Sequence, residues 1–559
     1  MIFWEKVKIC CNRVIKAAFE KRLWFLAGMV CFNFIPGALI RAELGQYMGI
    51  ILYGLFLLMI MTFFTIVLEL IPSNIIKKFL FITIFILNAV VLLLEIFTVY
   101  KYKALIGAGI ITAVLDTNLH ETKEFFKMYV GMKWILAMAV YDMCIYWVYK
   151  YRARISMRLS GLSYMLIILI LTISGGLSWN YLRESHQYKT QPPFTQTAMA
   201  AGIAVKNIRN ADAIENRAAE PVEILQNDST IPNIVFIIGE STNRDHMHLY
   251  GYPLPDTPRF DELKKKHEIA VFENCVSPHA TTVAVLQELL TFGDYESTKP
   301  WYEYNSIIDV MKAAGYRTYW LSNQESSGIY GNIGLHFAKE SDFSKFTRTR
   351  DSSENMSIYD QELFPLIDNA IKNHAEKNFY AIHLIGEHAG YSDRYPNDFN
   401  KFSKDDIKGD LSDYKKSILA QYANAVYYND YIVNNIIDKF RDLNAIVIYV
   451  PDHGETIFDN GSDFNGHVEE NINHYMLEIP VIMWASASFR QQYPKKWLAI
   501  QKSVNEPYMT DDMIHTVLDI ADIKTNEYDS SRSIINSNFN KDRRRMVDGR
   551  DYDTEISGK

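Results

Sequence analysis

Three apolar segments in the C-terminal half of the chain each end in a short polar cluster that could do chemistry. Residues 233–242 read NIVFIIGEST, residues 379–388 read FYAIHLIGEH, and residues 445–455 read AIVIYVPDHGE. Short apolar runs of this kind predict buried β-strands. In open α/β sheets, ligands bind beyond the carboxyl ends of the strands. The three clusters therefore predict one functional site, provided that the three strands are neighbours in the sheet.

The side chains at two of these strand ends form a set of potential metal ligands. Glu240, Asp452 and His453 offer carboxylate oxygens and an imidazole nitrogen, which suit zinc first and manganese second. In the alternative interpretation, Asp452 caps a helix or turn and His453 is an exposed loop residue. Because three strand ends carry such groups, we expect a metal site.

The elements that would position these residues alternate between strand and helix. Helical periodicity is clearest over residues 305–314, 360–374 and 412–440. Buried strands that alternate with helices predict an α/β domain with a central, mostly parallel sheet. We place this domain at residues 232–559, after a polar, proline-containing bridge at residues 181–231.

The first 180 residues have a more apolar composition and predict a five-helix transmembrane domain. A span needs about 20 mostly apolar residues, and five stretches qualify: Leu23–Ile40, Met48–Ile71, Phe79–Tyr100, Met128–Tyr149 and Leu162–Trp179. The first of them contains Pro36 and could instead be a half-buried segment.

Ionisable residues also occur within these stretches. Glu95 and Asp142 lie near the ends of their stretches, and we expect both to reach the membrane interface. An amphipathic helix within residues 101–127 is expected to lie in the outer, periplasmic interface.

Lysine and arginine are unequally distributed between the two sets of loops. Twelve lie in the N-terminal tail and in the loops after the second and fourth stretches, and five lie in the other loops. Positive charge accumulates on the cytoplasmic side, so five spans would place the C-terminal half outside. The net charge of −8 gives no reason to expect nucleic-acid binding. The five cysteines do not decide the compartment.

Five separated segments resemble the lipid A and lipopolysaccharide-core phosphoethanolamine transferases of the alkaline-phosphatase/sulfatase superfamily. The GESTNR and LTF sequences, and the single cysteine after residue 180, are most similar to the lipopolysaccharide-core branch. The resemblance extends over essentially the whole chain, and the segments occur in the family's order at residues 233–260, 277–292, 320–324, 382–396 and 451–460.

The resemblance implies a membrane enzyme with its catalytic domain in the periplasm. Such an enzyme lies in the inner membrane of a Gram-negative bacterium. It transfers phosphoethanolamine from phosphatidylethanolamine to lipopolysaccharide, at the core or at lipid A, a modification linked in the family to antimicrobial-peptide resistance.

The resemblance also implies a zinc-dependent mechanism through a covalent threonine intermediate. The threonine joins Glu240, Asp452 and His453 as a metal ligand, because coordination is one of the few ways to activate a hydroxyl at neutral pH. Thr281 and Thr282 compete for this role. The spacing to the following VLQELLTF segment favours Thr282 and leaves Thr281 as a helix N-cap.

Histidines near the substrate are implied in the same way. His388 matches the family histidine close to the substrate phosphate. Another family histidine lies about a dozen residues after the DHG sequence, where this chain has Asn465. His467 and His474 are therefore both candidates for that role, and one or two zinc ions are compatible with the sequence.

Thr117 and Glu121 match a helical pair that the family places near the lipid donor. Four residues apart, they share one helix face, where a carboxylate could engage the ethanolamine ammonium group. A solvated helix face is the competing interpretation.

Other functions remain compatible with the sequence. A membrane-anchored phosphoglycerol transferase, a phosphodiesterase and a catalytically silent envelope-assembly scaffold are the alternatives. The sequence leaves the acceptor open between a core heptose, a lipid A phosphate, a glucan and a protein.

Overall fold

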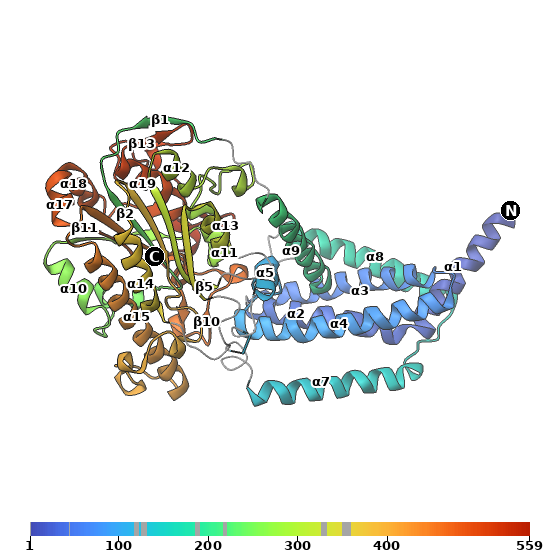
Figure 1. Ribbon diagram of the computed structural model, residues 1–559. Coiled ribbons are helices and arrows are strands. Elements are labelled where there is room, and N and C mark those ends of the chain that lie inside the picture. The colour runs from blue at the N-terminus through green and yellow to red at the C-terminus, as the bar shows by residue number, and fades with distance from the viewer. Residues whose placement is uncertain are drawn as a thin grey trace. The chain divides into compact units, whose positions relative to one another are not determined.

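The computed structural model describes residues 2–43, 45–116, 122–123, 131–184, 191–215, 221–325, 333–348 and 359–558. The chain forms two compact units, residues 1–112 with 126–206 and residues 113–125 with 207–559 (Figure 1).

The first unit consists of helices. Within the described residues, four helices are long and apolar enough to cross a membrane by length and composition: α2 (Leu23–Glu43), α3 (Tyr47–Glu69), α4 (Asn74–Tyr102) and residues Gly161–Arg183 of α8 (Gly161–Glu184). They coincide with four of the five predicted spans. Helices α1 (Ile2–Lys21) and α7 (Met132–Tyr151) also belong to this unit, whereas α5 (Ala108–Asp116) and α9 (Pro193–Glu215) begin in it and end in residues assigned to the second unit.

Helix α7 occupies the position of the remaining predicted span. It has 20 residues, and its sequence contains Lys133, Asp142 and Lys150. It is not among the four spanning candidates of the described chain, so the fifth span stays a prediction. The number of spans matters, because only an odd number places the two ends of the chain on opposite sides of a membrane.

Glu95 of α4 is buried inside the first unit. Its carboxylate accepts hydrogen bonds from the Ile106 backbone N–H at 3.0 Å and from Thr197 Oγ1 at 3.1 Å. The expected position of Glu95 at the membrane interface stays a prediction, but its carboxylate is buried among polar partners. A buried carboxylate needs such donors, and here they come from segments that the apolar pattern of α4 cannot reveal.

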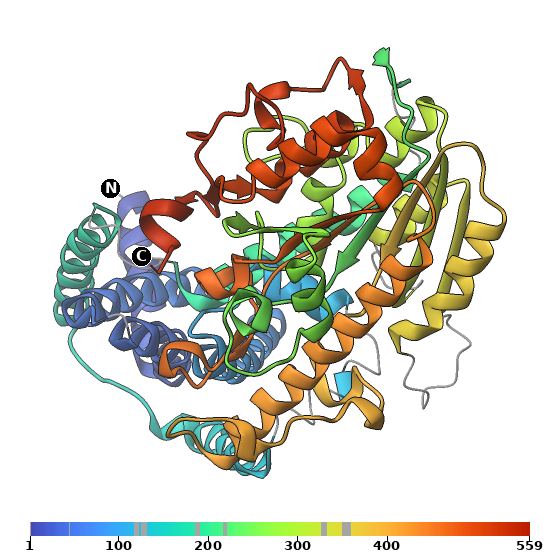
Figure 2. The ribbon, with the colours of Figure 1, turned by 90° about the vertical axis from the view of Figure 1, so that its left-hand side faces the viewer.

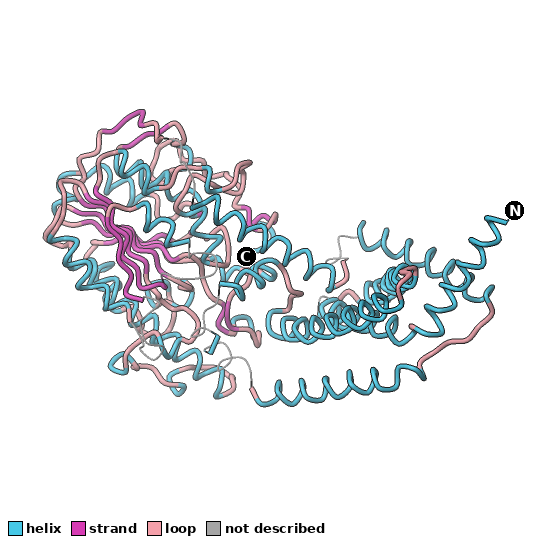
Figure 3. The backbone as a smooth tube through the Cα atoms, turned by 45° about the vertical axis from the view of Figure 1, so that its right-hand side comes forward, coloured by secondary structure: helices cyan, strands magenta, loops and turns pink. Residues whose placement is uncertain are grey.

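The second unit is built on a seven-stranded sheet with the order β3-β11-β8-β2-β7-β5-β6 (Figure 3). The five strands from β8 to β6 are parallel, whereas β11 runs antiparallel to both of its neighbours. The sheet is therefore mixed, and it is mostly parallel as predicted. Its strands are β2 (Asn233–Gly239), β3 (Ile269–Phe272), β5 (Arg317–Glu325), β6 (Phe343–Arg348), β7 (Asn378–His383), β8 (Ala445–Pro451) and β11 (Val481–Ala485).

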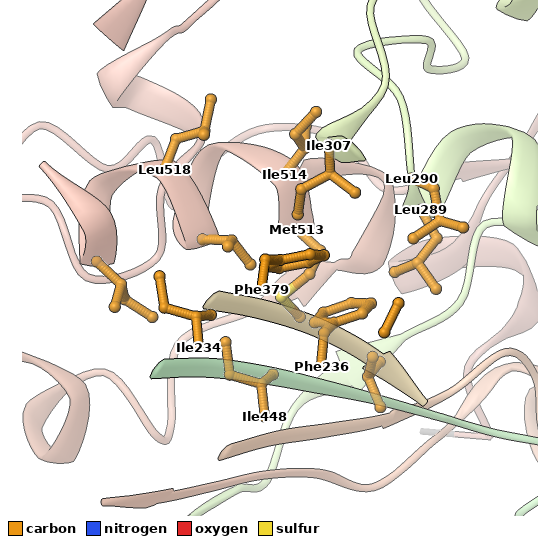
Figure 4. Packing of buried hydrophobic residues seen from close by; sticks show 14 of the residues in the cluster. Ile234, Phe236, Leu289, Leu290, Ile307, Phe379, Ile448, Met513, Ile514 and Leu518 are labelled. Carbon is orange, nitrogen blue, oxygen red and sulfur yellow. The ribbon is translucent and has the colours of Figure 1, made fainter. Parts of the chain in front are cut away.

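Helices cover both faces of this sheet (Figure 2). On one face Phe236, Phe379 and Ile448 pack in the same cluster as Met513 of α19 (Met513–Ala521) (Figure 4). On the other face Tyr380 packs in a cluster with residues of α15 (Asp413–Lys439). Because both faces are covered, all residues of β2, β7 and β8 are buried, which explains their continuous apolar runs.

The covering helices include the three predicted from periodicity, now seen as α12, α14 and α15. The face containing Phe236 is covered by α11 (Thr282–Leu289), α12 (Ile307–Ala313), α13 (Ile333–Glu340), α17 (Ala487–Gln492), α18 (Pro494–Lys502) and α19 (Met513–Ala521). The opposite face is covered by α10 (Pro258–Lys265), α14 (Phe364–Lys372) and α15 (Asp413–Lys439).

Short elements complete the second unit. The four-residue helix α16 spans His474–Leu477. Four strand pairs lie outside the main sheet: β1 (Ile224–Asn227) with β13 (Ile523–Thr525), β4 (Cys275–Val276) with β12 (Tyr508–Met509), β9 (Thr456–Ile457) with β10 (Asn465–Gly466), and β14 (Met546–Val547) with β15 (Arg550–Asp551). Strand β1 and helix α9 lie in the segment that the sequence analysis assigns to the bridge.

Candidate metal centre

The central position of β2 brings two of the three polar clusters together. Gly239 at the end of β2 pairs with Pro451 at the end of the parallel strand β8. The next residues, Glu240 and Asp452, therefore lie at the same edge of the sheet. Thr282 reaches this edge as the first residue of α11. The predicted convergence of these strand ends is confirmed.

Four side chains from three segments meet at this edge. Thr282 Oγ1 donates to Glu240 Oε2 at 3.1 Å and lies 3.5 Å from His453 Nε2. The same imidazole nitrogen lies 3.6 Å from Glu240 Oε1 and 3.4 Å from Asp452 Oδ2. Glu240, Asp452 and His453 thus form a group compact enough to hold a metal ion.

The chemistry of the group also fits a metal ion. Asp452 Oδ2 is buried and has no hydrogen-bond partner among the described residues. His453 Nδ1 donates to the Gly454 carbonyl at 2.8 Å, so Nε2 is left with a lone pair for a ligand bond. Burial and the nearby Asp452 carboxylate raise the pKa of Glu240 well above its ordinary value, and burial lowers the pKa of His453. Two buried carboxylates held this close need a cation to balance them.

Two residues that the sequence analysis did not select hold the carboxylates in place. Ser241 has a left-handed backbone conformation with φ 57°. This conformation directs its backbone N–H to Asp452 Oδ1 at 3.1 Å, while its hydroxyl donates to Glu240 Oε1 at 2.8 Å. Gln324, at the end of β5, donates from Nε2 to Glu240 Oε2 at 3.3 Å. Their signal was present in the GEST and WLSNQ segments, but only the fold shows what they contact.

Gly386 is required where the turn after β7 contacts Glu240. Its φ is +47°, and a Cβ atom there would lie 2.8 Å from the Glu240 carbonyl oxygen. We expect Gly386→Ala to lower the free energy of unfolding by roughly 1–3 kcal/mol through backbone strain and to weaken metal binding by displacing Glu240. Chemical denaturation and metal titration would measure the two effects.

Gly461→Ala provides the matched control, because Gly461 also has a positive φ, +72°, but faces open space. It should show strain without loss of metal affinity. Equal metal affinity in the two variants would show that Gly386 does not position Glu240 for metal binding.

The structure separates the two threonines. Thr281 occupies the N-cap position of α11 but makes no side-chain cap bond within the described structure. Its hydroxyl instead donates to Glu469 Oε1 at 2.9 Å. Thr282, one residue later, is the threonine directed to Glu240.

The histidine candidates also separate. His467 Nδ1 lies 2.7 Å from Glu455 Oε2, and its ring centroid lies 4.1 Å from that of His453. Burial opposes protonation of His467, but the Glu455 carboxylate outweighs it and raises the histidine pKa. His453, Glu455 and His467 form a second group of potential metal ligands. His474 instead lies against Tyr475, with a centroid distance of 3.9 Å and the rings tilted by 37°.

His388 lies in the turn that begins with Gly386. This turn contacts Glu240 through the backbone, since the Glu387 N–H donates to the Glu240 carbonyl oxygen at 3.0 Å. The remaining predicted site residues, Thr117 and Glu121, lie outside the described residues.

Comparisons with known families match both regions of the chain. Residues 232–523 match the Sulfatase family model. Residues 60–187 match the model described as "Phosphoethanolamine transferase EptA/EptB".

Individual proteins show the same similarity. Phosphoethanolamine transferase EptC from Escherichia coli O18:K1:H7 is 30% identical over 333 residues, which cover 58% of this chain and 57% of EptC. The match thus spans less than two thirds of that relative's length. Phosphoethanolamine transferase CptA from Salmonella typhimurium is 26% identical over 467 residues, with 77% and 78% covered.

Two solved structures are similar as well. The periplasmic domain of E. coli EptC in complex with Zn is 29% identical, has a TM-score of 0.56, and covers 60% of this chain and 97% of its own. The lipooligosaccharide phosphoethanolamine transferase EptA from Neisseria meningitidis, an integral membrane protein, has a TM-score of 0.65 at 20% identity. It covers 92% of this chain and 98% of its own, and at that identity it supports the fold alone.

Proposed function

Because this chain belongs to the sulfatase family, and because residues 60–187 match phosphoethanolamine transferases, we propose that it transfers phosphoethanolamine from phosphatidylethanolamine to lipopolysaccharide. The observation that carries the proposal is the Thr282 hydroxyl at the buried Glu240–Asp452–His453 group. A hydroxyl beside a metal site is the arrangement that a covalent phosphoryl-group transfer needs.

We propose zinc as the resident ion, with manganese second, held by Glu240, Thr282, Asp452 and His453. Oxygen and imidazole ligands of this kind suit zinc. When bound, the ion lowers the pKa of the nucleophilic hydroxyl and balances negative charge on the phosphoryl oxygens. The His453–Glu455–His467 group shares His453 with the first group, and the Nδ1 atom of that histidine is bonded to the Gly454 carbonyl, so we propose a single ion.

The proposed reaction has two displacement steps. In the first, Thr282 Oγ1 loses its proton and bonds to the donor phosphorus, the bond from phosphorus to the diacylglycerol oxygen breaks, and that oxygen takes up a proton as diacylglycerol leaves. In the second, an acceptor oxygen bonds to phosphorus and loses its proton, while the threonine oxygen leaves and is protonated again. His467, oriented by Glu455, would exchange a proton with the substrate at Nε2, and His388 would contact a phosphoryl oxygen.

The other parts of the chain would bring lipid substrates to this site. We propose that residues 1–180 anchor the protein in the inner membrane and that residues 232–559 form the catalytic domain. Residues 181–231 would connect the two. Thr117 and Glu121 would hold the donor, with the carboxylate facing the ethanolamine ammonium group.

The loop charges, twelve against five, support a cytoplasmic N-terminus and a periplasmic catalytic domain. This orientation needs α7 as the fifth span. We therefore expect activity from a reporter enzyme that works only outside the cytoplasm when it is fused after Thr281. Activity of a cytoplasm-specific reporter at the same position would contradict both the orientation and the fifth span.

The proposed activity can be tested with the full-length protein in vesicles that contain phosphatidylethanolamine, phosphatidylglycerol and lipopolysaccharide. We expect loss of phosphatidylethanolamine and a phosphoethanolamine mass increment on lipopolysaccharide. Consumption of phosphatidylglycerol would favour a phosphoglycerol transferase, and donor loss without acceptor modification would favour a phosphodiesterase. A protein that binds no metal and consumes neither lipid would be a silent scaffold.

A further inference from the structure

A cavity lies in the second unit beside the segment that carries Thr282. Its volume is about 510 Å³, within the range of about 300–1,000 Å³ for small-molecule sites. Its walls come from three segments: Pro278, His279 and Glu288; Tyr295 and Glu296; and Arg544, Met546, Asp548 and Gly549.

Two residues of the first wall flank the proposed nucleophile, Thr282, in the sequence. His279 precedes Thr282 by three residues, and Glu288 follows it by six within α11. At a rise of 1.5 Å per residue, Glu288 lies about 9 Å along the helix from Thr282. Six residues also turn the helix by about 600°, so Glu288 faces about 120° away from Thr282. A ligand in the cavity would therefore reach the hydroxyl past His279, at the N-terminal end of α11.

Polar contacts connect this wall to the nucleophile segment. His279 Nε2 lies 3.4 Å from Glu288 Oε1, and its Nδ1 lies 3.6 Å from Glu469 Oε1. The same Glu469 oxygen accepts from the Ala280 N–H at 2.8 Å and from Thr281 Oγ1 at 2.9 Å. Although burial opposes it, the two carboxylates raise the pKa of His279 to about 10, so an imidazolium ion holds this wall together.

The second wall is held by a network of arginines. Arg543 stacks on the Tyr295 ring at 4.7 Å and forms an ion pair with Asp511 at 2.8 Å. Arg532 forms ion pairs with Asp294 and Glu296, the neighbours of Tyr295. This wall is therefore fixed before a ligand arrives, which lowers the entropic cost of binding.

The charges of the walls indicate which ligand they suit. Three carboxylates line the cavity, from Glu288, Glu296 and Asp548, and the first two are paired with His279 and Arg532. The two cations that line the cavity are also paired, His279 as described and Arg544 with Asp551 at 2.8 Å. A phosphate would therefore have to displace a carboxylate in order to gain a cation. Carboxylates beside the surfaces of Tyr295 and Met546 instead suit a neutral molecule with many hydroxyl groups and apolar ring faces.

We propose that this cavity binds a neutral saccharide portion of the acceptor and presents a neighbouring part of it to Thr282. The proposal rests on the proposed function, because only a glycosylated acceptor would need such a subsite. It assigns acceptor selection to the residues that line the cavity, which do not include the proposed metal ligands Glu240, Thr282, Asp452 and His453.

Binding can be measured without turnover. The probe is the core oligosaccharide released from lipopolysaccharide by removing lipid A, titrated calorimetrically into the full-length protein in detergent. Asp548→Asn removes one carboxylate and suits the left-handed conformation at this position, φ 49°. Met546→Trp should fill part of the cavity. Asp542→Asn, exposed on the same segment but outside the cavity, is the control.

We expect both cavity variants to weaken oligosaccharide binding at least tenfold and the control to retain it, with thermal unfolding confirming that each protein is folded. No binding by the wild type, or equal affinity in folded variants, would overturn the proposal. So would loss of binding after enzymatic removal of the oligosaccharide phosphates, because the ligand would then be recognised as an anion.

A kinetic readout separates this subsite from the proposed function. In the cavity variants, transfer to lipopolysaccharide should fall at least tenfold more than release of diacylglycerol from phosphatidylethanolamine, mainly through a higher KM for the acceptor. An equal fall in both steps would overturn the subsite and leave the transferase intact. A wild type that binds oligosaccharide but never transfers phosphoethanolamine would instead overturn the proposed function.

Discussion

Thr282→Ala is expected to abolish both transfer and the covalent adduct. The Thr282 hydroxyl lies between Glu240 and His453. The Ser241 hydroxyl also contacts Glu240, but Ser241 is completely buried. Loss of a nucleophile that acts together with its activating groups costs about 10⁴-fold or more in kcat. Mass spectrometry of peptides, after incubation with donor alone, should show phosphoethanolamine on Thr282 in the wild type.

The neighbouring threonine is the matched control. Thr281→Ala removes a hydrogen bond to Glu469, worth about 1.5–3 kcal/mol for a charged partner, so it should lower activity moderately while the adduct persists. Thr282→Ser keeps a hydroxyl and should retain residual activity. An adduct mapped to Thr281 would reverse the assignment, and an active enzyme without any adduct would indicate direct transfer.

The second large effect is expected at the metal ligands. Asp452→Asn or Glu240→Gln removes one of two buried charges that would balance the ion, and either change should abolish turnover and metal binding together. The apoprotein should remain folded, because each amide relieves repulsion between the Glu240 and Asp452 side chains. Metal content and thermal unfolding, with and without added zinc, would measure these effects.

Ligand linkage makes this experiment quantitative. Zinc at a hundred times its Kd should stabilise the wild type by about 2.7 kcal/mol and should leave Asp452→Asn unchanged. A chelator should inactivate the wild type, and zinc should restore it. Asp410→Asn, which changes an exposed residue, should behave like the wild type. Full activity in metal-stripped protein would refute the metal requirement.

The sequence predicts secondary structure best where every side chain of an element is buried, because the element is then a continuous apolar run. Because β2, β7 and β8 are covered on both faces, their apolar runs were recognisable as strands, and the polar residues after them marked the site. The long helix α15, Asp413–Lys439, was recognisable because apolar residues recur at helical spacing from Ile418 to Ile437.

Interactions between distant segments could not be predicted in the same way. β2 lies between β7 and β8 because it pairs with strands that are roughly 140 and 210 residues away in the sequence. Local β-propensity carries no information about such distant pairing. The pairing of Glu455 with His467, the contacts of Gln324 and Ser241 with the carboxylates, and the burial of Glu95 all depend on such long-range contacts.

The central position of β2 also determines when the site can form during biosynthesis. β2 ends at Gly239, and its neighbour β8 begins only at Ala445. At about 5–20 residues per second, a ribosome needs about 10–40 s to synthesise the intervening segment. Until β7 (Asn378–His383) has been made, both edges of this apolar strand lack their partners, and afterwards the β8 edge still lacks one, which favours aggregation. A chaperone that shields residues 233–239 would therefore increase the yield of protein competent to acquire its metal.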